Sequence, residues 1–445
     1  MKCAKIVICI LIFIFSSILN FQCQKQKEKV DNDIEITFWH SFVSSTIPAL
    51  NNLIAKFESE NPNIRIKAQY IPSGDALIQK LISAVQSETA PDISWIHADY
   101  LSELVQANAI YKMRHFIDSE NGLTEEDIND IYPPLLHYAS WRDTLYSMPL
   151  EATNLALLYN KDMLYEVGLD SSRPPQTWDE LHAYAKRLTV DRDNDGKFDQ
   201  VGFFVPIYPA SGPLGAWMVW QWIPFLWQAG GYVIDQNQSQ VLYNSSSGIQ
   251  ALTFWQALFN MVDISTFTVD YQVAFAAKRL AMALDGPWNL PRYNKLLRNL
   301  DWAIAPLPEG PEKRVTIVAG EYLAIFKQSR YPQEAWQFIK WVIQPENQAF
   351  WSIRSGYLPM RRSVLNIPEF KDYMKSNKNF AVFVKQMEYG QSQRSIDYHG
   401  IAITRHIADA IEKATIGKMD SREALDEAAN KSNTLLNSVQ EDLKK

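Results

Sequence analysis

The sequence predicts an α/β protein built from two lobes. Its 445 residues exceed what one hydrophobic core usually organises, so two cores are expected. A strand pattern over Asp33–Trp39, a helical pattern over Ala49–Glu60 and a strand pattern over Ile64–Tyr70 follow one another. Such a βαβ unit pairs its two strands in parallel. A further strand–helix pattern, Leu145–Gly168, lies where we expect the chain to leave one lobe and start the other.

The first lobe continues with a helix over Leu77–Val85 and a third strand over Asp92–Ile96. In open parallel sheets, ligands bind at the carboxyl ends of the strands. The loops that follow the three strands therefore form one predicted cleft. Their candidate binding residues are Trp39, His40, Asp75 and Asp99, and a capping or surface role is the alternative for each.

The pattern at the expected change of lobe is a buried strand followed by a capped helix. Leu155–Tyr159 is almost continuously apolar, as in a strand buried on both faces. Asn160 is a suitable N-cap for the helix that follows, and Gly168 is a suitable stop. Further along, Thr177 and Glu180 have the spacing of a capping box at the start of another helix.

Composition and motifs exclude several classes of function. A net charge of −7, from 43 basic and 50 acidic residues, gives no support to binding of nucleic acid or an anionic membrane, which needs a basic patch. The 14 tryptophans suit stacking on neutral ligands. Neither HExxH nor GxSxG occurs, which disfavours zinc and serine hydrolases. An exported glycoside hydrolase with paired acids in a cleft remains an alternative.

The N-terminus is typical of an exported protein. Lys2 and Lys5 precede an apolar run that is too short for a membrane span, so residues 1–22 are predicted to be a signal peptide. Cys23 follows directly, as in a lipidated protein, and residues 23–33 form a polar tether. Gln22 departs from the small residue usual before such a cysteine, so plain secretion and an uncleaved anchor stay open. Cys23 would be the only cysteine of the mature chain.

One acidic turn has two interpretations. Asp191, Asp193, Asp195 and Gly196 match the first six positions of a calcium loop, and Asp199 suits position 9. Position 12, which normally carries a bidentate Glu, is Gly202. The turn is therefore either a weak structural calcium site or an Asx-type turn without metal.

Several motifs, in this order along the chain, resemble the carbohydrate-binding proteins of ABC importers. That family includes maltose-binding and glycerol-phosphate-binding proteins. The motifs are Trp39-His40, Ala90-Pro91-Asp92-Ile93, Tyr146-x-x-Pro149 followed by Tyr159-Asn160, Pro174-Pro175-x-Thr177-Trp178, Gly286-Pro287-Trp288 and Gly356-Tyr357-Leu358-Pro359-x-Arg361.

The resemblance implies a two-lobed periplasmic-binding-protein clamp, each lobe a sheet flanked by helices, with the ligand cleft between the lobes. Residues 34–150 and 318–362 would form lobe 1, and residues 151–317 and 363–445 would form lobe 2. The protein would be a monomer without enzymatic activity or a required cofactor. It would capture a sugar by lobe closure and deliver it to the membrane permease, held by lipid at the periplasmic or outer face of the membrane.

The resemblance also implies where the ligand binds. Asp99 falls at a sugar-contacting aspartate of the family, Trp220 at a stacking aromatic, and Trp288 next to the ligand. Core packing is the alternative for Trp217, and the expected role of Trp222 and Trp227. The remaining implied contacts lie at the first crossing between lobes, at the second crossing and at the rim: Glu151, Thr153, Gly320, Glu321, Tyr357 and Arg361.

The sequence favours a neutral mono- or oligosaccharide over glycerol phosphate. Phosphate capture needs cationic or NH-rich groups. Arg361 and Arg405 are the candidates, but no arginine-rich cluster occurs in the predicted cleft loops.

Overall fold

The computed structural model describes residues 34–72, 75–212, 214–260, 270–393 and 396–442. The predicted signal peptide, Cys23 and the tether lie outside these ranges. None of the helices in the described ranges combines the length and apolar character that a membrane span requires.

The first lobe is built on a five-stranded sheet. In order across the sheet, its strands are β2 (Ile64–Tyr70), β1 (Ile34–His40), β3 (Ile93–Ile96), β12 (Tyr322–Ile325) and β6 (Met148–Pro149). β1 pairs in parallel with β2 and β3, which confirms the predicted βαβ unit. β12 runs antiparallel between β3 and β6, so a segment from late in the chain completes this sheet.

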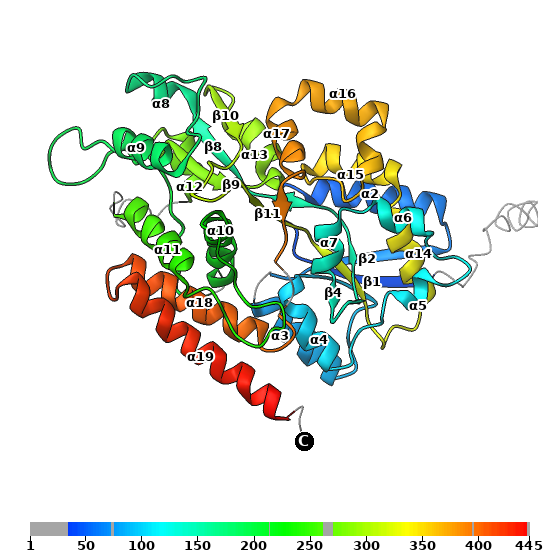
Figure 1. Ribbon diagram of the computed structural model, residues 1–445. Coiled ribbons are helices and arrows are strands. Elements are labelled where there is room, and N and C mark those ends of the chain that lie inside the picture. Colours follow the sequence, from blue (N-terminus) through cyan, green and yellow to red (C-terminus); the bar gives the residue numbers. More distant parts are fainter. Residues whose placement is uncertain (1–33, 73–74, 213, 261–269, 394–395, 443–445) are drawn as a thin grey trace, which may run out of the picture.

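Helices cover this sheet, on the right in Figure 1. They are α2 (Ile47–Glu60), α3 (Asp75–Gln86), α4 (Leu101–Gln106), α5 (Arg114–Ile117), α6 (Glu125–Asp130), α7 (Pro133–Tyr138), α14 (Pro332–Val342) and α15 (Pro345–Ser355). Short 3-10 turns η1 (Ala98–Tyr100) and η4 (Arg362–Asn366) and a hairpin of β4 (Ser140–Trp141) and β5 (Thr144–Leu145) complete the lobe.

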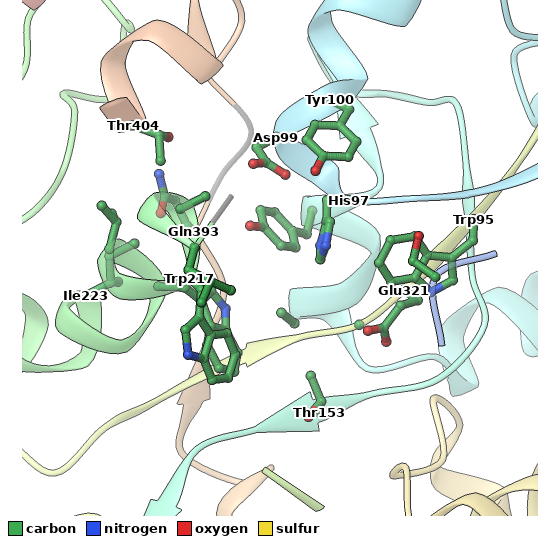
Figure 2. A pocket seen from close by; sticks show the side chains of 18 of the residues that line it. Trp95, His97, Asp99, Tyr100, Thr153, Trp217, Ile223, Glu321, Gln393 and Thr404 are labelled. Atoms are coloured by element: carbon green, nitrogen blue, oxygen red, sulfur yellow. The ribbon is translucent and has the colours of Figure 1, made fainter. Parts of the chain in front are cut away.

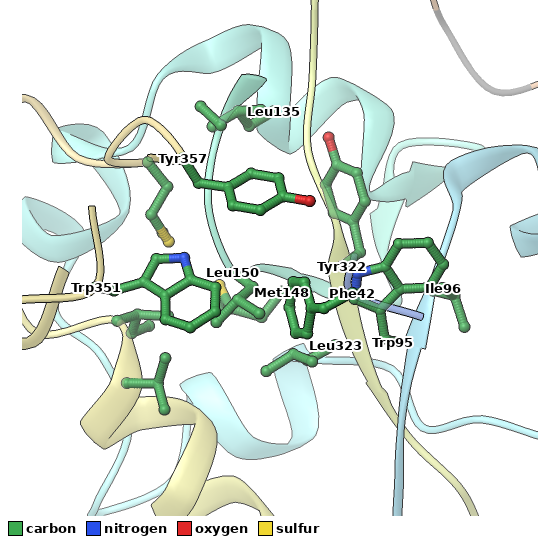
Figure 3. Close-up of a cluster of buried hydrophobic side chains, with 14 of the residues drawn as sticks. Phe42, Trp95, Ile96, Leu135, Met148, Leu150, Tyr322, Leu323, Trp351 and Tyr357 are labelled. Carbon is green, nitrogen blue, oxygen red and sulfur yellow. The ribbon is translucent and has the colours of Figure 1, made fainter. Parts of the chain in front are cut away.

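Aromatic packing joins these helices to the sheet. Phe57 of α2 packs edge-on against Phe338 and Trp341 of α14, with ring centroids 5.0 and 5.4 Å apart. The ring centroids of Phe42 and Trp351 lie 5.2 Å apart in the same core, beside Met148 and Leu150 (Figure 3). This core lies directly beneath the point where the chain leaves the lobe.

The second lobe is built on a three-stranded sheet in the order β10-β8-β9. Its strands are β8 (Ala156–Asn160), β9 (Met282–Asp285) and β10 (Trp302–Ala305), all antiparallel. Every residue of β8 is buried, as its apolar run predicts. The Asn160 side chain accepts a hydrogen bond from the Met163 amide, which confirms it as the N-cap of α8 (Lys161–Glu166).

Helices pack around this smaller sheet. They are α9 (Trp178–Leu188), α10 (Gly215–Gln228), α11 (Ser246–Phe259), α12 (Tyr271–Ala276), α13 (Leu290–Leu296), α18 (Gly400–Thr415) and α19 (Ser421–Asp442), with the 3-10 turn η3 (Pro287–Asn289). Trp222 and Trp227 of α10 are buried, which confirms their core role. α18 and α19 lie side by side, next to α10 and α11 (Figure 1).

The predicted capping box at α9 is half formed. The Thr177 hydroxyl accepts from the Glu180 amide, as expected. The Glu180 carboxylate, however, accepts from the Gln176 amide and pairs with Arg173 instead of returning to the Thr177 amide. The nearby guanidinium offers Glu180 a charged partner, which a neutral amide does not.

A small third sheet lies where the chain passes between the lobes. β11 (Thr316–Ala319) pairs antiparallel with β7 (Thr153–Asn154) and parallel with β13 (Gly390–Gln391). β11 lies at the centre of Figure 1, between the two groups of elements. Nearby, α16 (Pro368–Ser376) contacts α15 of the first lobe, and α17 (Lys378–Gln386) contacts β10 of the second.

Candidate functional site

A cavity of about 430 Å³ opens between the lobes, and both lobes line it (Figure 2). The lining residues come from the segments after β1 and β3, from the small central sheet and the loop after β13, from helix α10 and from the start of α18. The lining residues on which the site depends are Trp95, His97, Asp99, Thr153, Tyr208, Trp217, Trp220, Tyr271, Trp288, Gly320, Glu321, Tyr357, Gln393 and Thr404.

One wall of the cavity is aromatic. Trp217 and Trp220 are three residues apart on α10, so they share a helix face, and their rings stack with centroids 5.1 Å apart. Trp288 approaches both, at 5.7 and 6.1 Å. All three are only partly buried, so their ring faces are available to a ligand. Such flat apolar surfaces suit the C–H faces of a sugar ring.

Trp288 owes its position to the turn before it. A Cβ atom on Gly286 would lie 1.7 Å from the Trp288 ring, so only glycine lets the ring fold over its own backbone. The Trp288 ring also lies 6.2 Å from that of Tyr357, which comes from the first lobe. The aromatic wall therefore spans both lobes.

A buried carboxylate supports this wall from behind. Asp285 accepts hydrogen bonds from the Tyr271 hydroxyl at 2.8 Å, the Asn289 amide at 2.8 Å and the Gly286 backbone amide at 2.7 Å. The Tyr293 hydroxyl donates a fourth. Burial raises the pKa of the Asp285 carboxyl. Asp285 thus holds Tyr271 and the turn before Trp288 in place.

The opposite side of the cavity is polar. Asp99 lies in η1 directly after β3, where the sheet rule places it, and faces the cavity together with His97 (Figure 2). Thr153 and Glu321 come from the two central crossings. The Thr153 hydroxyl is buried and has no hydrogen-bond partner among the described residues. It is therefore free to bind a ligand hydroxyl.

Glu151 lies behind Glu321 and outside the lining. Its side chain is fully buried, and in the described part of the chain no hydrogen-bond partner reaches either of its carboxylate oxygens or the Glu321 Oε2 atom. Burial raises the pKa of Glu151 well above its usual range, and the Glu321 charge raises it further. The backbones touch as well, since Leu150 donates to the Glu321 carbonyl at 2.8 Å.

The structure brings most of the predicted binding residues together. Asp99, Thr153, Trp217, Trp220, Trp288, Gly320, Glu321 and Tyr357 all line the cavity. Asp75 begins α3, but its side chain lies outside the described part of the structure.

Besides Glu151, three predicted residues do not line the cavity: Trp39, His40 and Arg361. Trp39 lies under Lys80, whose Nζ atom is 4.7 Å from the ring centroid. His40 is 4% exposed between Phe38 and Phe42, and burial lowers its pKa to about 4. These two residues end the β1 strand, and the chain turns inward only at Ser41, which does reach the cavity.

Arg361 is not at the cleft rim but inside the first lobe. Its side chain is 6% exposed and pairs with Asp127 at 2.5 Å and Asp130 at 2.8 Å, both on α6. It also donates to the Ile343 carbonyl at 3.2 Å. The arginine therefore holds the segment after Tyr357 against α6, and the rim assignment is corrected.

Several lining residues carry no local signal in the sequence. Trp95 lies within β3, ahead of the loop after the strand that the sheet rule selects. Tyr208 and Gln393 come from two different loops and Thr404 from helix α18, and tertiary packing brings all three to the cavity. The strand rule identifies only loops of the parallel unit, so it could not have found them.

The acidic turn is a compact loop. Oxygens of Asp191, Asp193 and Asp195 lie within 4.8 Å of one another, whereas Asp199 accepts from the Arg192 amide instead. Backbone amides of the turn donate to two of these carboxylates, since Asp191 Oδ2 accepts from the Gly196 amide and Asp193 from the Asp195 amide. The Asp191 Oδ1 atom has no hydrogen-bond partner among the described residues. Both interpretations fit this geometry, and calcium binding stays a prediction.

Comparison with known proteins finds a matching family and relatives that cover most of the chain. A family model described as bacterial extracellular solute-binding protein matches residues 52–379. The chain is 21% identical to the sn-glycerol-3-phosphate-binding periplasmic protein UgpB of Escherichia coli, over 90% of this chain and 92% of that protein.

Solved structures have the same fold. The cyclic alpha-maltosyl-1,6-maltose binding protein of Arthrobacter globiformis superposes with a TM-score of 0.75 at 24% identity, over 91% of this chain and 99% of that one. An ABC transporter solute-binding protein of Thermotoga lettingae bound with alpha-D-tagatose superposes with a TM-score of 0.77 at 21% identity, over 91% of this chain and 100% of that one. Both likenesses show the two-lobed fold.

Proposed function

Because the chain belongs to the bacterial extracellular solute-binding proteins, we propose that it captures a mono- or oligosaccharide between its lobes and delivers it to an ABC permease. The wall formed by Trp217, Trp220 and Trp288 supports a sugar ligand most directly. It offers flat apolar surfaces to sugar C–H faces, opposite polar groups for the hydroxyl edges. The cavity, at about 430 Å³, has the size of a small-molecule site.

Capture uses both lobes. Trp217 and Trp220 belong to the second lobe, whereas Asp99 and Tyr357 belong to the first. A ligand held by both groups favours the closed arrangement, because only closure makes both sets of contacts. To shift the clamp from mostly open to mostly closed, the ligand must favour closure by about 5.5 kcal/mol. Stacking on several rings and hydrogen bonds to carboxylates supply energies of this order.

A glycerol-phosphate ligand is the alternative in the same fold, and the name of the Escherichia coli relative, an sn-glycerol-3-phosphate-binding protein, supports this alternative. Phosphate capture relies on Arg, Lys or converging amide groups. Among the described lining residues there is no Lys or Arg, while two carboxylates, Asp99 and Glu321, face the cavity. These charges favour a ligand without an anionic group.

We further propose binding without turnover, export through the N-terminal signal, anchoring by lipid at Cys23, and action as a monomer. The relatives named above are described as binding proteins, which supports the first of these. A glycoside hydrolase with the same clamp would instead release shortened sugars.

A thermal-shift screen of the purified protein tests the function. The panel contains neutral mono- and oligosaccharides, glycerol phosphate and glycerophosphodiesters. A ligand at a hundredfold excess over its dissociation constant adds about 2.7 kcal/mol to the free energy of unfolding. A shift with a sugar and no product on incubation is expected. A shift with phosphate compounds alone contradicts the sugar assignment, and turnover of the sugar contradicts the binding role.

A further inference from the structure

Two glutamates meet at the crossings between the lobes. Glu151 follows β6 on the first crossing, and Glu321 lies between β11 and β12 on the second. The Leu150 amide donates to the Glu321 carbonyl at 2.8 Å. A Cβ atom on Gly320 would lie 2.1 Å from the Glu151 carbonyl oxygen, so the two backbones are in direct contact. This contact brings both carboxyl groups into one buried region.

No positive charge of the described chain neutralises this pair. The described ion pairs include neither glutamate, and three of the four carboxylate oxygens of the pair have no hydrogen-bond partner among the described residues. A buried carboxylate without a partner is costly, and two adjacent ones cost more. The pair therefore either retains a proton or receives a positive charge from outside the protein.

The groups that face the pair are neutral near pH 7. His97 faces Glu321 from the loop after β3, and burial lowers the pKa of this histidine. Tyr357 and Tyr322 face both carboxyls, and burial raises their pKa values well above the usual range. The Trp351 indole faces Glu151 from α15. Figure 3 shows the rings of Trp351, Tyr357 and Tyr322 in the hydrophobic cluster of the first lobe.

The cavity gives a ligand access to the pair through Glu321. This side chain lines the cavity beside Thr153, whose hydroxyl is an additional unpaired acceptor. Trp288 and Tyr357 also line the cavity, and aromatic ring faces attract cations. Unpaired carboxylates next to aromatic faces are the environment in which an ammonium group is bound most favourably.

We propose that the Glu151–Glu321 pair binds a positively charged amine of the ligand, so that the captured solute is an amino sugar or an oligosaccharide containing one. This inference rests on the proposed sugar function and makes it more specific. An ammonium group donates up to three hydrogen bonds and supplies the charge that the pair lacks. A hydroxyl in the same place supplies a hydrogen bond but leaves the charge unbalanced.

Proton release distinguishes the two kinds of ligand. If the pair shares a proton when empty, an ammonium group displaces it, because the positive charge stabilises the fully ionised pair. A neutral sugar leaves that proton in place. Binding of the amino sugar is therefore expected to release a proton, which calorimetry detects as a binding enthalpy that depends on the ionisation enthalpy of the buffer.

Calorimetric titration of matched sugar pairs tests the proposal. Glucose, galactose, mannose and cello-oligosaccharides are each compared with the 2-amino-2-deoxy counterpart, at about pH 6.5 where an amine remains protonated. A charge-assisted contact predicts about 10- to 100-fold tighter binding of an amino member, with proton release. Equal or weaker binding of every amino member overturns the proposal but leaves sugar capture intact. Absence of binding by all sugars contradicts the sugar function itself.

Two variants and a control test which residues cause the preference for the amino sugar and the proton release. Glu321→Gln is expected to abolish both the preference for the amino sugar over its neutral counterpart and the proton release. Glu151→Gln is expected to abolish the proton release. Glu309→Gln, an acid with a half-exposed side chain outside the cavity lining, serves as the matched control and is expected to retain both effects. The proposal is overturned if the preference for the amino sugar persists in Glu321→Gln, or if Asp99→Asn abolishes that preference instead.

Discussion

Trp217 and Trp220 stack one helical turn apart on α10, with ring centroids 5.1 Å apart and an interplanar angle of 21°. Each is partly exposed to the cavity, while Trp222 on the same helix is fully buried. One helix thus supplies both a core residue and a binding surface. The distinction between these two roles leads to several predictions.

Trp220→Ala is expected to weaken sugar binding with little loss of stability. The ring contributes a stacking surface, and the loss of one aromatic stacking partner costs about 1 kcal/mol or more of binding free energy. The dissociation constant, measured by calorimetry, should rise about fivefold or more. Tyr165→Ala is the matched control, since this tyrosine is 77% exposed and lies outside the cavity lining. An unchanged dissociation constant in Trp220→Ala would refute the stacking role.

Thr153→Val separates binding from folding. Valine has the shape of threonine, and the Thr153 hydroxyl has no hydrogen-bond partner to lose in the described structure. The free energy of unfolding should therefore stay the same or increase. The ligand should lose one hydrogen bond, about 0.5 to 1.5 kcal/mol of binding free energy. A denaturant titration and a binding titration on the same preparation check both halves, and destabilisation without weaker binding contradicts the assignment.

Gly320→Ala is expected to disrupt the contact between the crossings. The added methyl group would lie 2.1 Å from a backbone oxygen, which cannot move aside as a flexible side chain would. We expect a loss of about 1 to 3 kcal/mol in the free energy of unfolding. At Gly400 an added methyl group would meet its nearest atom at an ordinary 3.6 Å, so Gly400→Ala is the stability control. Equal thermal stability of the two variants would contradict the close approach.

The buried Glu151 predicts a specific dependence of stability on pH. Its pKa is raised in the folded state, so the folded protein holds a proton that the unfolded chain releases above its ordinary value of 4.5. The stabilising contribution of this group is present below that value and decreases as the pH rises through the folded pKa. In thermal melts, Glu151→Gln should gain stability relative to the native protein as the pH increases, whereas Glu309→Gln should not. A constant difference between Glu151→Gln and the native protein across pH would disprove the shifted titration.

Arg361→Met tests the structural role assigned to this arginine. It leaves Asp127 and Asp130 without their guanidinium partner, and breaking a buried ion pair typically costs about 3 to 5 kcal/mol. The free energy of unfolding, measured with denaturant, should fall accordingly. The dissociation constant for sugar, measured well below the melting temperature, should change less than about threefold. Weaker binding with full stability would restore the rim assignment.

Local patterns predicted much of this molecule because their causes are local. Alternation in β1, the buried run in β8 and the Asn160 cap depend on neighbours within a few residues. The carboxyl-end rule placed Asp99 correctly because β1 and β3 are parallel neighbours. The same rule failed for Trp39 and His40, since both still belong to β1 and the first residue to reach the cavity is Ser41.

The sequence by itself determined the two-lobed α/β class, the aromatic face of α10 and the Gly-Pro-Trp turn. These features can be read directly from the spacing of apolar residues and from the positions of glycine and proline. Only the tertiary structure decided that Arg361 pairs with α6, that Tyr208, Gln393 and Thr404 reach the cavity, and that Glu151 lies against Glu321. Each of these relationships joins residues distant in the chain. Distant residues meet through the packing of whole elements, and no short stretch of sequence encodes that packing.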